Sequence, residues 1–295
     1  MTPKTTAGWR HRAARAAVLV LAAGSLAAGI TEPASASVVR QPLTGLELVS
    51  YTTVSNSDPW FKFASKTCPN NKTVVGTGWS TNPSTSQLRL QFLKPYEHSV
   101  TAQVFEAYSG YDSPWSLTVY AMCADRPPGW SLTSTTDTTD SDDYHSAYVD
   151  CPGTTVPLAG GVEHMVPHGQ AVVTDIDIDL TGVRASAYEH EDGYDDDWWV
   201  RAYAICADPP TGWELRSSSN QTAYPTTSET VGCSANRTAI GAGADLNGAY
   251  GEVVLKSLKT FAYGGGEYAM ATASEDATGA PDTWTFTTDV ICVDQ

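Results

Sequence analysis

The chain has 295 residues, 41% of them hydrophobic, and its 33 acidic and 17 basic side chains give a net charge of −16 at pH 7. Such an acidic surface disfavours nucleic acid and anionic lipid as partners and favours cations and basic proteins. Six cysteines without any CxxC pair are typical of an exported, disulfide-bonded protein rather than of a zinc protein.

The first 36 residues have the pattern of a leader. Basic residues precede an apolar run at 16–30, and the small residues at 34–36 form a cleavage site. This pattern predicts a secretory signal peptide over 1–36, followed by a short lead-in at 37–44. The apolar run is shorter than the roughly 18 residues that cross a membrane, so we expect an extracellular protein without a membrane anchor.

The rest of the chain repeats itself three times. Gly45, Gly129 and Gly212 each open a similar segment, and they are 84 and 83 residues apart. Such a period indicates three copies of one structural unit. The predicted repeats are residues 45–128, 129–211 and 212–295.

One strand is the clearest common feature of the repeats. The segment 198–206 reads WWVRAYAIC, and its counterparts at 115–123 and 284–292 also place a Trp eight residues before a Cys. An even spacing puts both side chains on the same face of a strand. We therefore expect a buried core strand in each repeat.

The six cysteines fall into three pairs with separations of 55, 55 and 59 residues. Fifteen pairings are possible, and one bridge within each repeat is the simplest in an exported protein. The expected disulfides are Cys68–Cys123, Cys151–Cys206 and Cys233–Cys292.

Short alternating runs rich in Val, Thr and Tyr, without helical periodicity, predict an all-β fold of about five strands per repeat. We expect the last two strands of each repeat to form a hairpin, around 108–114 in the first. The favoured architecture is a β-prism-like body with pseudo-threefold symmetry, and the alternative is three small β-sandwiches in tandem. In the first repeat the expected strands are 46–53, 73–80, 88–94, 99–107 and 115–123.

The repeat pattern resembles a known group of proteins. Cys-Pro, a Gly-bearing strand, W-x7-C and A-x-C-A-D-x-P-x-G together resemble a three-fold repeat family of exported proteins from high-GC Gram-positive bacteria, mostly of unassigned function. The third repeat departs from this pattern with Val293 and with no Pro after Cys233. The resemblance implies export and repetition, and it implies no catalytic residue.

An acidic segment stands out in the second repeat. Six carboxylates occur within the nine residues 189–197, and Ca²⁺ is the cation that several carboxylate oxygens bind well. The segment does not match an EF-hand loop, and a solvated acidic turn is the simpler interpretation. The candidate calcium ligands are Glu189, Glu191, Asp192, Asp195, Asp196 and Asp197.

Aromatic residues suggest a second kind of site. Nine Trp and fourteen Tyr exceed what the three core tryptophans require. Rings beside carboxylates are typical of sugar-binding surfaces, although the same rings also fill the faces between sheets. The candidate ligand-binding residues are Tyr111, Tyr194, Trp199 and Tyr203.

No catalytic motif is present, and a repeated unit favours binding through avidity over a single catalytic centre. We therefore expect a secreted, non-catalytic binding or structural protein, with an extracellular glycan or cell-envelope polymer as ligand and Ca²⁺ as an assisting ion. One alternative is a secreted hydrolase with a scattered carboxylate site. Another is a protein-binding partner, such as a protease inhibitor, that recognises basic proteins.

Overall fold

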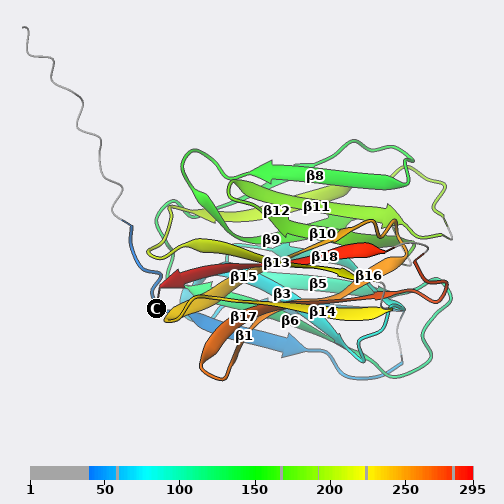
Figure 1. Cartoon of the computed structure of the whole chain (residues 1–295), viewed down its shortest axis with the longest axis horizontal. Helices are drawn as coiled ribbons and strands as arrows, with labels where there is room; N and C mark the ends of the chain where they lie inside the picture. Colours follow the sequence, from blue (N-terminus) through cyan, green and yellow to red (C-terminus); the bar gives the residue numbers. More distant parts are fainter. Residues whose placement is uncertain are drawn as a thin grey trace, which may run out of the picture. The chain divides into compact units, whose positions relative to one another are not determined.

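The chain forms three antiparallel β-sheets in a computed structural model (Figure 1). The described residues contain eighteen strands and one short 3-10 helix, Pro69–Asn71, so the protein is all-β as predicted. The predicted leader lies outside the described residues. These are residues 40–57, 60–166, 169–191, 193–222, 225–280 and 283–294.

Each repeat supplies two groups of three strands, which we call the core half and the hairpin half. The core half contains the Trp–Cys strand. The core halves are β1 (Glu47–Thr52), β3 (Thr73–Asn82) and β6 (Ser116–Ala124); β7 (Ser131–Thr136), β9 (Val156–His164) and β12 (Val200–Ala207); and β13 (Glu214–Thr222), β15 (Arg237–Asn247) and β18 (Trp284–Asp294). The hairpin halves are β2 (Phe61–Thr67), β4 (Leu88–Pro95) and β5 (Ser99–Glu106); β8 (Tyr144–Asp150), β10 (Ala171–Ile178) and β11 (Gly182–Glu189); and β14 (Thr226–Gly232), β16 (Val253–Tyr263) and β17 (Gly266–Glu275).

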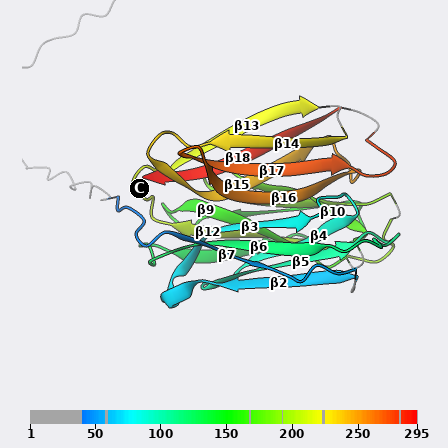
Figure 2. The same ribbon diagram turned by 90° about the horizontal axis from the view of Figure 1, so that it is seen from below.

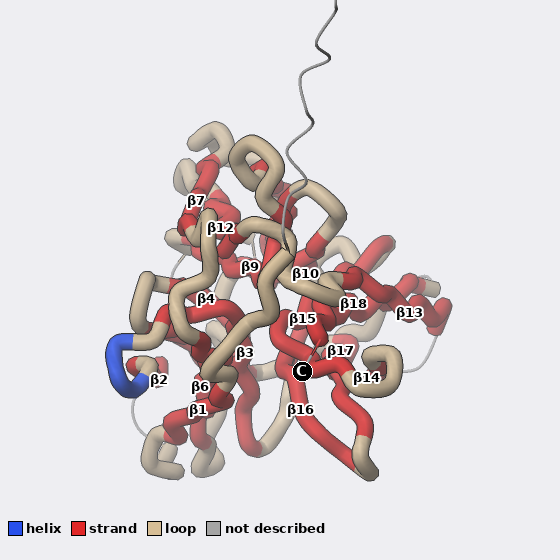
Figure 3. Tube along the Cα trace, turned by 90° about the vertical axis from the view of Figure 1, so that its left-hand side faces the viewer, coloured by secondary structure: helices blue, strands red, loops and turns tan. Residues whose placement is uncertain are grey.

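Every sheet is shared by two repeats. The 1–3 sheet has the order β1-β6-β3-β16-β17-β14, the 2–3 sheet β13-β18-β15-β10-β11-β8, and the 1–2 sheet β2-β5-β4-β9-β12-β7. The seams between repeats are the pairs β3–β16, β10–β15 and β4–β9, each with two residues in register on either strand. Seen along the strands, the three repeats surround a common centre (Figure 3). The sheets therefore join the repeats into a pseudo-threefold body, and tandem sandwiches are not formed.

In Figure 2 the strands of the third repeat, coloured yellow to red, lie together beside those of the first two repeats. Where the central strands cross, the backbones touch. A Cβ atom on Gly76 would lie 1.8 Å from the carbonyl oxygen of Ile240, and one on Gly241 would lie 2.0 Å from that of Leu158. Because no real Cβ approaches an oxygen this closely, only glycine fits at these two crossings.

The predicted core strands are confirmed. Trp115, Trp198 and Trp284 are completely buried. The residues that alternate with them on the same face are buried too: Leu117, Val119, Ala121, Val200, Ala202, Ala204, Phe286, Thr288 and Val290. The even Trp–Cys spacing therefore marks the face that lies between the two halves of each repeat.

The three predicted disulfides are also confirmed, each with a Cα–Cα distance of 5.7 Å. Cys68 follows β2 directly, and Cys123 lies in β6. These two strands belong to different sheets. The bridge thus ties the hairpin half of a repeat to its core half, which adds a covalent link where no ladder hydrogen bonds exist.

The sixth strand of the first repeat, β2, was not predicted. Its alternation is inverted, since Phe61 and Phe63 are 41% and 52% exposed whereas Lys62 and Ala64 are buried. The Lys62 amine packs over the ring of Trp115, 4.8 Å from its centroid. A cation–π contact thus allows a lysine to occupy a core position, contrary to the usual hydrophobic pattern.

The predicted hairpin between the last two strands is wrong. β5 pairs with β2 and β4, whereas β6 pairs with β1 and β3, so the connection crosses from one sheet to the other. The same crossover joins β11 to β12 in the second repeat. In its described part, the acidic segment therefore begins at Glu189, the last residue of β11, and residues 190–191 and 193–197 lie between strands of two different sheets. Proximity of two strands in the sequence did not indicate their pairing.

Candidate functional site

A glutamate lies nine residues before each core tryptophan. Glu106 accepts the indole N–H of Trp115 at 2.9 Å and, through its other oxygen, the backbone N–H of Tyr111 at 3.1 Å. In the third repeat Glu275 accepts the indole N–H of Trp284 at 3.2 Å. These hydrogen bonds hold the loop that connects the two sheets of a repeat against the core tryptophan. This Glu–Trp spacing is visible in the sequence, where it was overlooked.

Glu189 occupies the same place in the second repeat. Its carboxylate accepts the backbone N–H of Tyr194 at 3.0 Å, while the Trp198 indole donates to the carbonyl of Asp142 at 3.0 Å. Burial raises the pKa of Glu189, and the hydrogen bond from Tyr194 acts in the opposite direction. The side chain expected to be a calcium ligand is thus engaged by its own loop.

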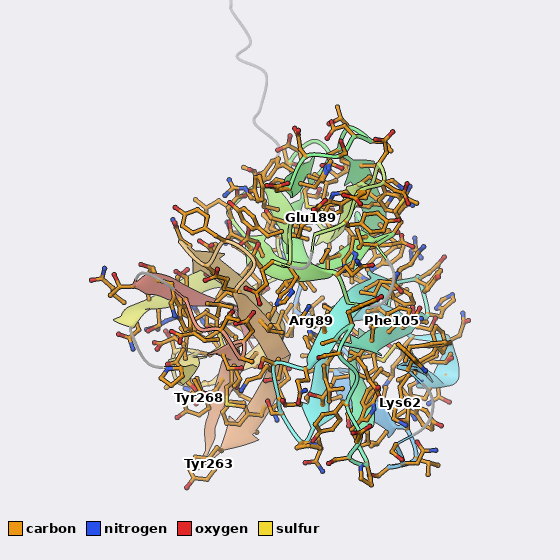
Figure 4. The ribbon with its side chains drawn as sticks, turned by 90° about the vertical axis from the view of Figure 1, so that its right-hand side faces the viewer. Lys62, Arg89, Phe105, Glu189, Tyr263 and Tyr268 are labelled. Atoms are coloured by element: carbon orange, nitrogen blue, oxygen red, sulfur yellow. A yellow bond between two sulfur atoms is a disulfide. The ribbon has the colours of Figure 1, made fainter. Side chains whose placement is uncertain are left out.

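The residue after each glutamate lies where the three repeats meet. It is Ala107 in the first repeat, His190 in the second and Asp276 in the third, and all three positions pack around a cavity of about 190 Å³. His190 Nε2 and Asp276 Oδ2 are 2.7 Å apart, and both side chains are buried. The guanidinium of Arg89 enters from the first repeat and donates to the carbonyl of Gly169 at 2.6 Å, near the centre of Figure 4.

Glu191 completes a small group of ligand atoms. One atom each from His190, Glu191 and Asp276 lie within 4.8 Å of one another, the one such cluster of three or more in the described part of the chain. Burial alone would raise the pKa of Asp276, but hydrogen bonds from Thr278 and His190 bring it below its ordinary value. The imidazole already bonds Asp276, so a cation here would compete with that hydrogen bond.

A larger cavity of about 380 Å³ is also lined by His190 and lies between the second and third repeats. Tyr188 and Tyr250 line it with ring centroids 5.9 Å apart and nearly perpendicular planes. The ring of Tyr144 packs against that of Tyr188, with centroids 4.4 Å apart and planes tilted by 34°. The cavity therefore has aromatic walls contributed by two repeats.

The other lining groups are mostly carboxylates. Glu252 has a buried oxygen, Oε2, without a hydrogen-bond partner among the described residues. Burial, followed by the charges of Asp276 and Glu191, raises the pKa of Glu252. Asp143 also lines the wall. The cavity thus offers several oxygen acceptors close to tyrosine rings, a combination suited to ligand hydroxyls or a ligand cation.

The structure separates most of the predicted calcium ligands. Glu191 belongs to the cluster with His190, and Glu189 fastens its loop. Asp195, Asp196 and Asp197 are exposed and belong to no cluster of three possible ligands within the described ranges, and Asp192 lies outside them.

The four predicted ligand-binding aromatics do not line the large cavity. Tyr111 and Tyr194 are partly buried against the core. The ring of Trp199 packs against the guanidinium of Arg201 at 4.9 Å. Tyr203 is buried, and its hydroxyl donates to Glu163. Sequence reasoning missed Tyr188, Tyr250, Glu252 and Asp276, because no local pattern places the second repeat beside the third.

A further acidic cluster lies at the seam of the 2–3 sheet. Asp175 faces Asp245 in register, and Asp177 lies close to Asp289 of β18. Burial and the neighbouring carboxylates raise the pKa of Asp245 and of Asp289 to about 7 each. In the 1–2 sheet the same seam holds a Lys94–Glu163 ion pair instead. The 2–3 seam therefore holds carboxyl groups that are partly protonated at neutral pH.

No known protein-family model matches the sequence, and the curated proteins include no detectable relative. Among the described residues, no helix is long and apolar enough to span a membrane. The three disulfides indicate an oxidising, extracellular environment.

Proposed function

We propose that the protein is an exported, non-catalytic binding protein whose cavity between the second and third repeats takes an extracellular glycan. The observation that carries this proposal is that one cavity of 380 Å³ combines the Tyr188 and Tyr250 rings with Glu252, whose Oε2 has no hydrogen-bond partner among the described residues. Sugars present apolar C–H faces that stack on aromatic rings and hydroxyls that donate to carboxylates.

The acidic surface and the resemblance to exported repeat proteins agree with this proposal. A net charge of −16 disfavours nucleic acid and anionic lipid as ligands. A neutral or cationic envelope polysaccharide is compatible with that charge. Because His190 already bonds Asp276, we expect binding without Ca²⁺, and a requirement for Ca²⁺ would instead assign a bridging ion to Glu191 and Asp276.

The test is binding of the disulfide-bonded protein to a glycan array and to insoluble envelope polysaccharides, with calcium and with chelator. Tyr188→Ala, Tyr250→Ala and Glu252→Gln should each weaken binding about tenfold, because each removes one ring or one charged acceptor. Tyr263→Ala is the control: Tyr263 is 76% exposed and lies well away from Glu189 in Figure 4. Absence of glycan binding, or equal loss in the control, would refute the proposal.

A second candidate function, protein binding, rests on a different surface. Phe61 and Phe63 project from edge strand β2 and contact Phe105 and Phe92 at centroid distances of 5.3 and 6.1 Å. Exposed aromatic patches of this kind mark protein interaction sites. A photo-crosslinker at Phe63, with Tyr263 as the control position, should give a discrete adduct with an extracellular protein if this function holds.

A further inference from the structure

The two positions after each loop glutamate carry different chemistry in each repeat. In the first repeat they hold Ala107 and Tyr108, neither of which is an imidazole or a carboxylate. In the second repeat they hold His190 and Glu191, and in the third repeat the first of them is Asp276. The pseudo-threefold pattern is therefore replaced here by one imidazole and two carboxylates, which are side chains that bind metal ions.

The carboxylate of Asp276 presents one oxygen to the second repeat. Its Oδ1 accepts the backbone N–H of Thr278 at 2.9 Å, the hydroxyl of Thr278 at 2.7 Å and the backbone N–H of Gly279 at 3.1 Å. The other oxygen, Oδ2, lies 2.7 Å from His190 Nε2. The orientation of Oδ2 is thus fixed from within the third repeat, as second-shell hydrogen bonds fix a ligand carboxylate.

His190 decides which kind of cation suits the group. An ionised carboxylate can only accept, so Nε2 holds the proton in its bond to Asp276. A metal ion bound at Nε2 would take the place of that proton, and the ring would then hold its proton on Nδ1. Ca²⁺ prefers oxygen ligands, whereas Zn²⁺ binds imidazole and carboxylate together. The group therefore suits a zinc-like ion better than calcium.

The remaining ligand, Glu191, can adjust to such an ion. One ligand atom from each of His190, Glu191 and Asp276 already lie within 4.8 Å of one another. Metal–ligand bonds of about 2.0–2.2 Å place the ligand atoms about 3 Å apart. Glu191 is exposed, so rotation of its side chain can close this difference without disturbing the core. All six cysteines are in disulfides, so no thiolate competes for the ion.

A further carboxylate beside the group has an oxygen without a partner. The carbonyl of Glu252 accepts the backbone N–H of Asp276 at 2.8 Å. Its Oε2 is buried and has no hydrogen-bond partner among the described residues. Burial, and after it the charges of Asp276 and Glu191, raise the pKa of Glu252. A divalent cation at this place would offset the repulsion among the three carboxylates.

We propose that His190, Glu191 and Asp276 bind one divalent ion of the zinc class, through the imidazole Nε2 and one oxygen of each carboxylate. Three protein ligands leave a coordination position for water or for a group of a bound ligand. His190 and Glu191 line both cavities, so small molecules can approach the ion from them. The proposal does not depend on the proposed glycan binding, because it requires no sugar.

The test is isothermal titration calorimetry of the disulfide-bonded protein, treated with chelator and dialysed, against zinc chloride. One ion should bind per chain, and calcium chloride in about thousandfold excess should not displace it. His190→Gln, Glu191→Gln and Asp276→Asn should each weaken zinc binding at least about tenfold, because loss of a ligand costs no less than loss of a second-shell partner.

A matched control comes from the first repeat. His98 Nε2 lies 3.5 Å from Glu97, and both side chains are exposed. This pair belongs to no cluster of three possible ligands in the described part of the chain. His98→Gln should therefore leave zinc binding unchanged. If a substitution at the buried pair prevents folding, Glu191→Gln still decides, because Glu191 is exposed.

Four results would overturn the proposal. They are no zinc binding by the wild type, unchanged zinc binding in folded Glu191→Gln, an equal loss in His98→Gln, and displacement of zinc by the excess of calcium. Glycan binding is measured separately on the metal-free protein. Failure of the zinc site and failure of the glycan site are therefore distinguishable.

Discussion

His190 of the second repeat and Asp276 of the third form a buried hydrogen bond of 2.7 Å across the junction of their repeats. The corresponding residue of the first repeat is Ala107, which can take no part in such a bond. The three-fold pattern is therefore broken at the centre, where polar groups from two repeats meet between the two cavities.

Removing one partner of this pair should be costly. We expect Asp276→Ala to lower the free energy of unfolding by about 3 kcal/mol at pH 7, because it removes a buried hydrogen bond of 2.7 Å between the two repeats. His190→Ala combined with Asp276→Ala should cost less than the sum of the two single changes. Urea unfolding of the four proteins measures the coupling, and strict additivity would contradict it.

The same pair predicts a loss of stability in acid. The folded-state pKa of Asp276 is lowered from its ordinary value of 3.8, so its contribution is present above about pH 4 and disappears as the pH falls through the folded pKa. The difference between wild type and Asp276→Ala should therefore shrink as the pH falls below 3.8. A difference that is independent of pH would show that the carboxylate charge is not responsible.

The raised pKa values of Asp245 and Asp289 predict that stability changes with pH in the opposite direction near neutrality. Their pKa values are raised to about 7, so between about pH 4 and 7 the folded protein binds more protons than the unfolded chain. Stability should then fall as the pH rises through this range, by about 2 kcal/mol once partial exposure of Asp245 is allowed for. Asp289→Asn should flatten the profile and stabilise the protein at pH 8.

Asp179 is the matched control for this prediction, because it lies just after the same strand, β10. Burial alone would raise its pKa, but hydrogen bonds from Thr181, Tyr148 and Gly182 hold it below its ordinary value. Asp179→Asn should therefore destabilise the protein at pH 8. Equal effects of Asp179→Asn and Asp289→Asn would contradict the assignment of a protonated carboxyl group to the seam.

Any side chain at position 76 should cause a severe packing defect. Its Cβ position lies 1.8 Å from the backbone oxygen of Ile240, which no side-chain movement can relieve. Gly76→Ala should cost more than about 4 kcal/mol or prevent folding. Gly153→Ala is the control, since Gly153 has a φ of +65° but open space around it, and it should cost about 1 kcal/mol. Equal losses of stability in the two variants, measured by thermal unfolding, would contradict the close backbone contact between Gly76 and Ile240.

The disulfides should contribute to the free energy of unfolding, because each one links two different sheets. Replacing Cys68 and Cys123 by serine removes a closure of 55 residues, and we expect a loss of about 4 kcal/mol. The corresponding change at Cys233 and Cys292 removes a closure of 59 residues and should cost nearly the same. Guanidinium unfolding measures both, and a negligible loss in either repeat would show that its two halves need no covalent link.

The sequence by itself determined the features that depend on local pattern and on repetition. The Trp–Cys spacing identified the buried face of each core strand, and the similar cysteine separations identified the three disulfides. Composition and short alternation indicated an all-β body with three-fold character. These inferences succeeded because strand periodicity and disulfide spacing are encoded within a single repeat.

The tertiary structure alone decided how the repeats combine. Two residues per strand join β3 to β16 at a seam, too few to leave a pattern in either segment. The seams and crossover loops place Tyr188 beside Tyr250 and His190 beside Asp276, about 60 and 86 residues apart in the chain. Contacts between repeats arise from the closing of three sheets around one axis, so no local periodicity can indicate which side chains meet there.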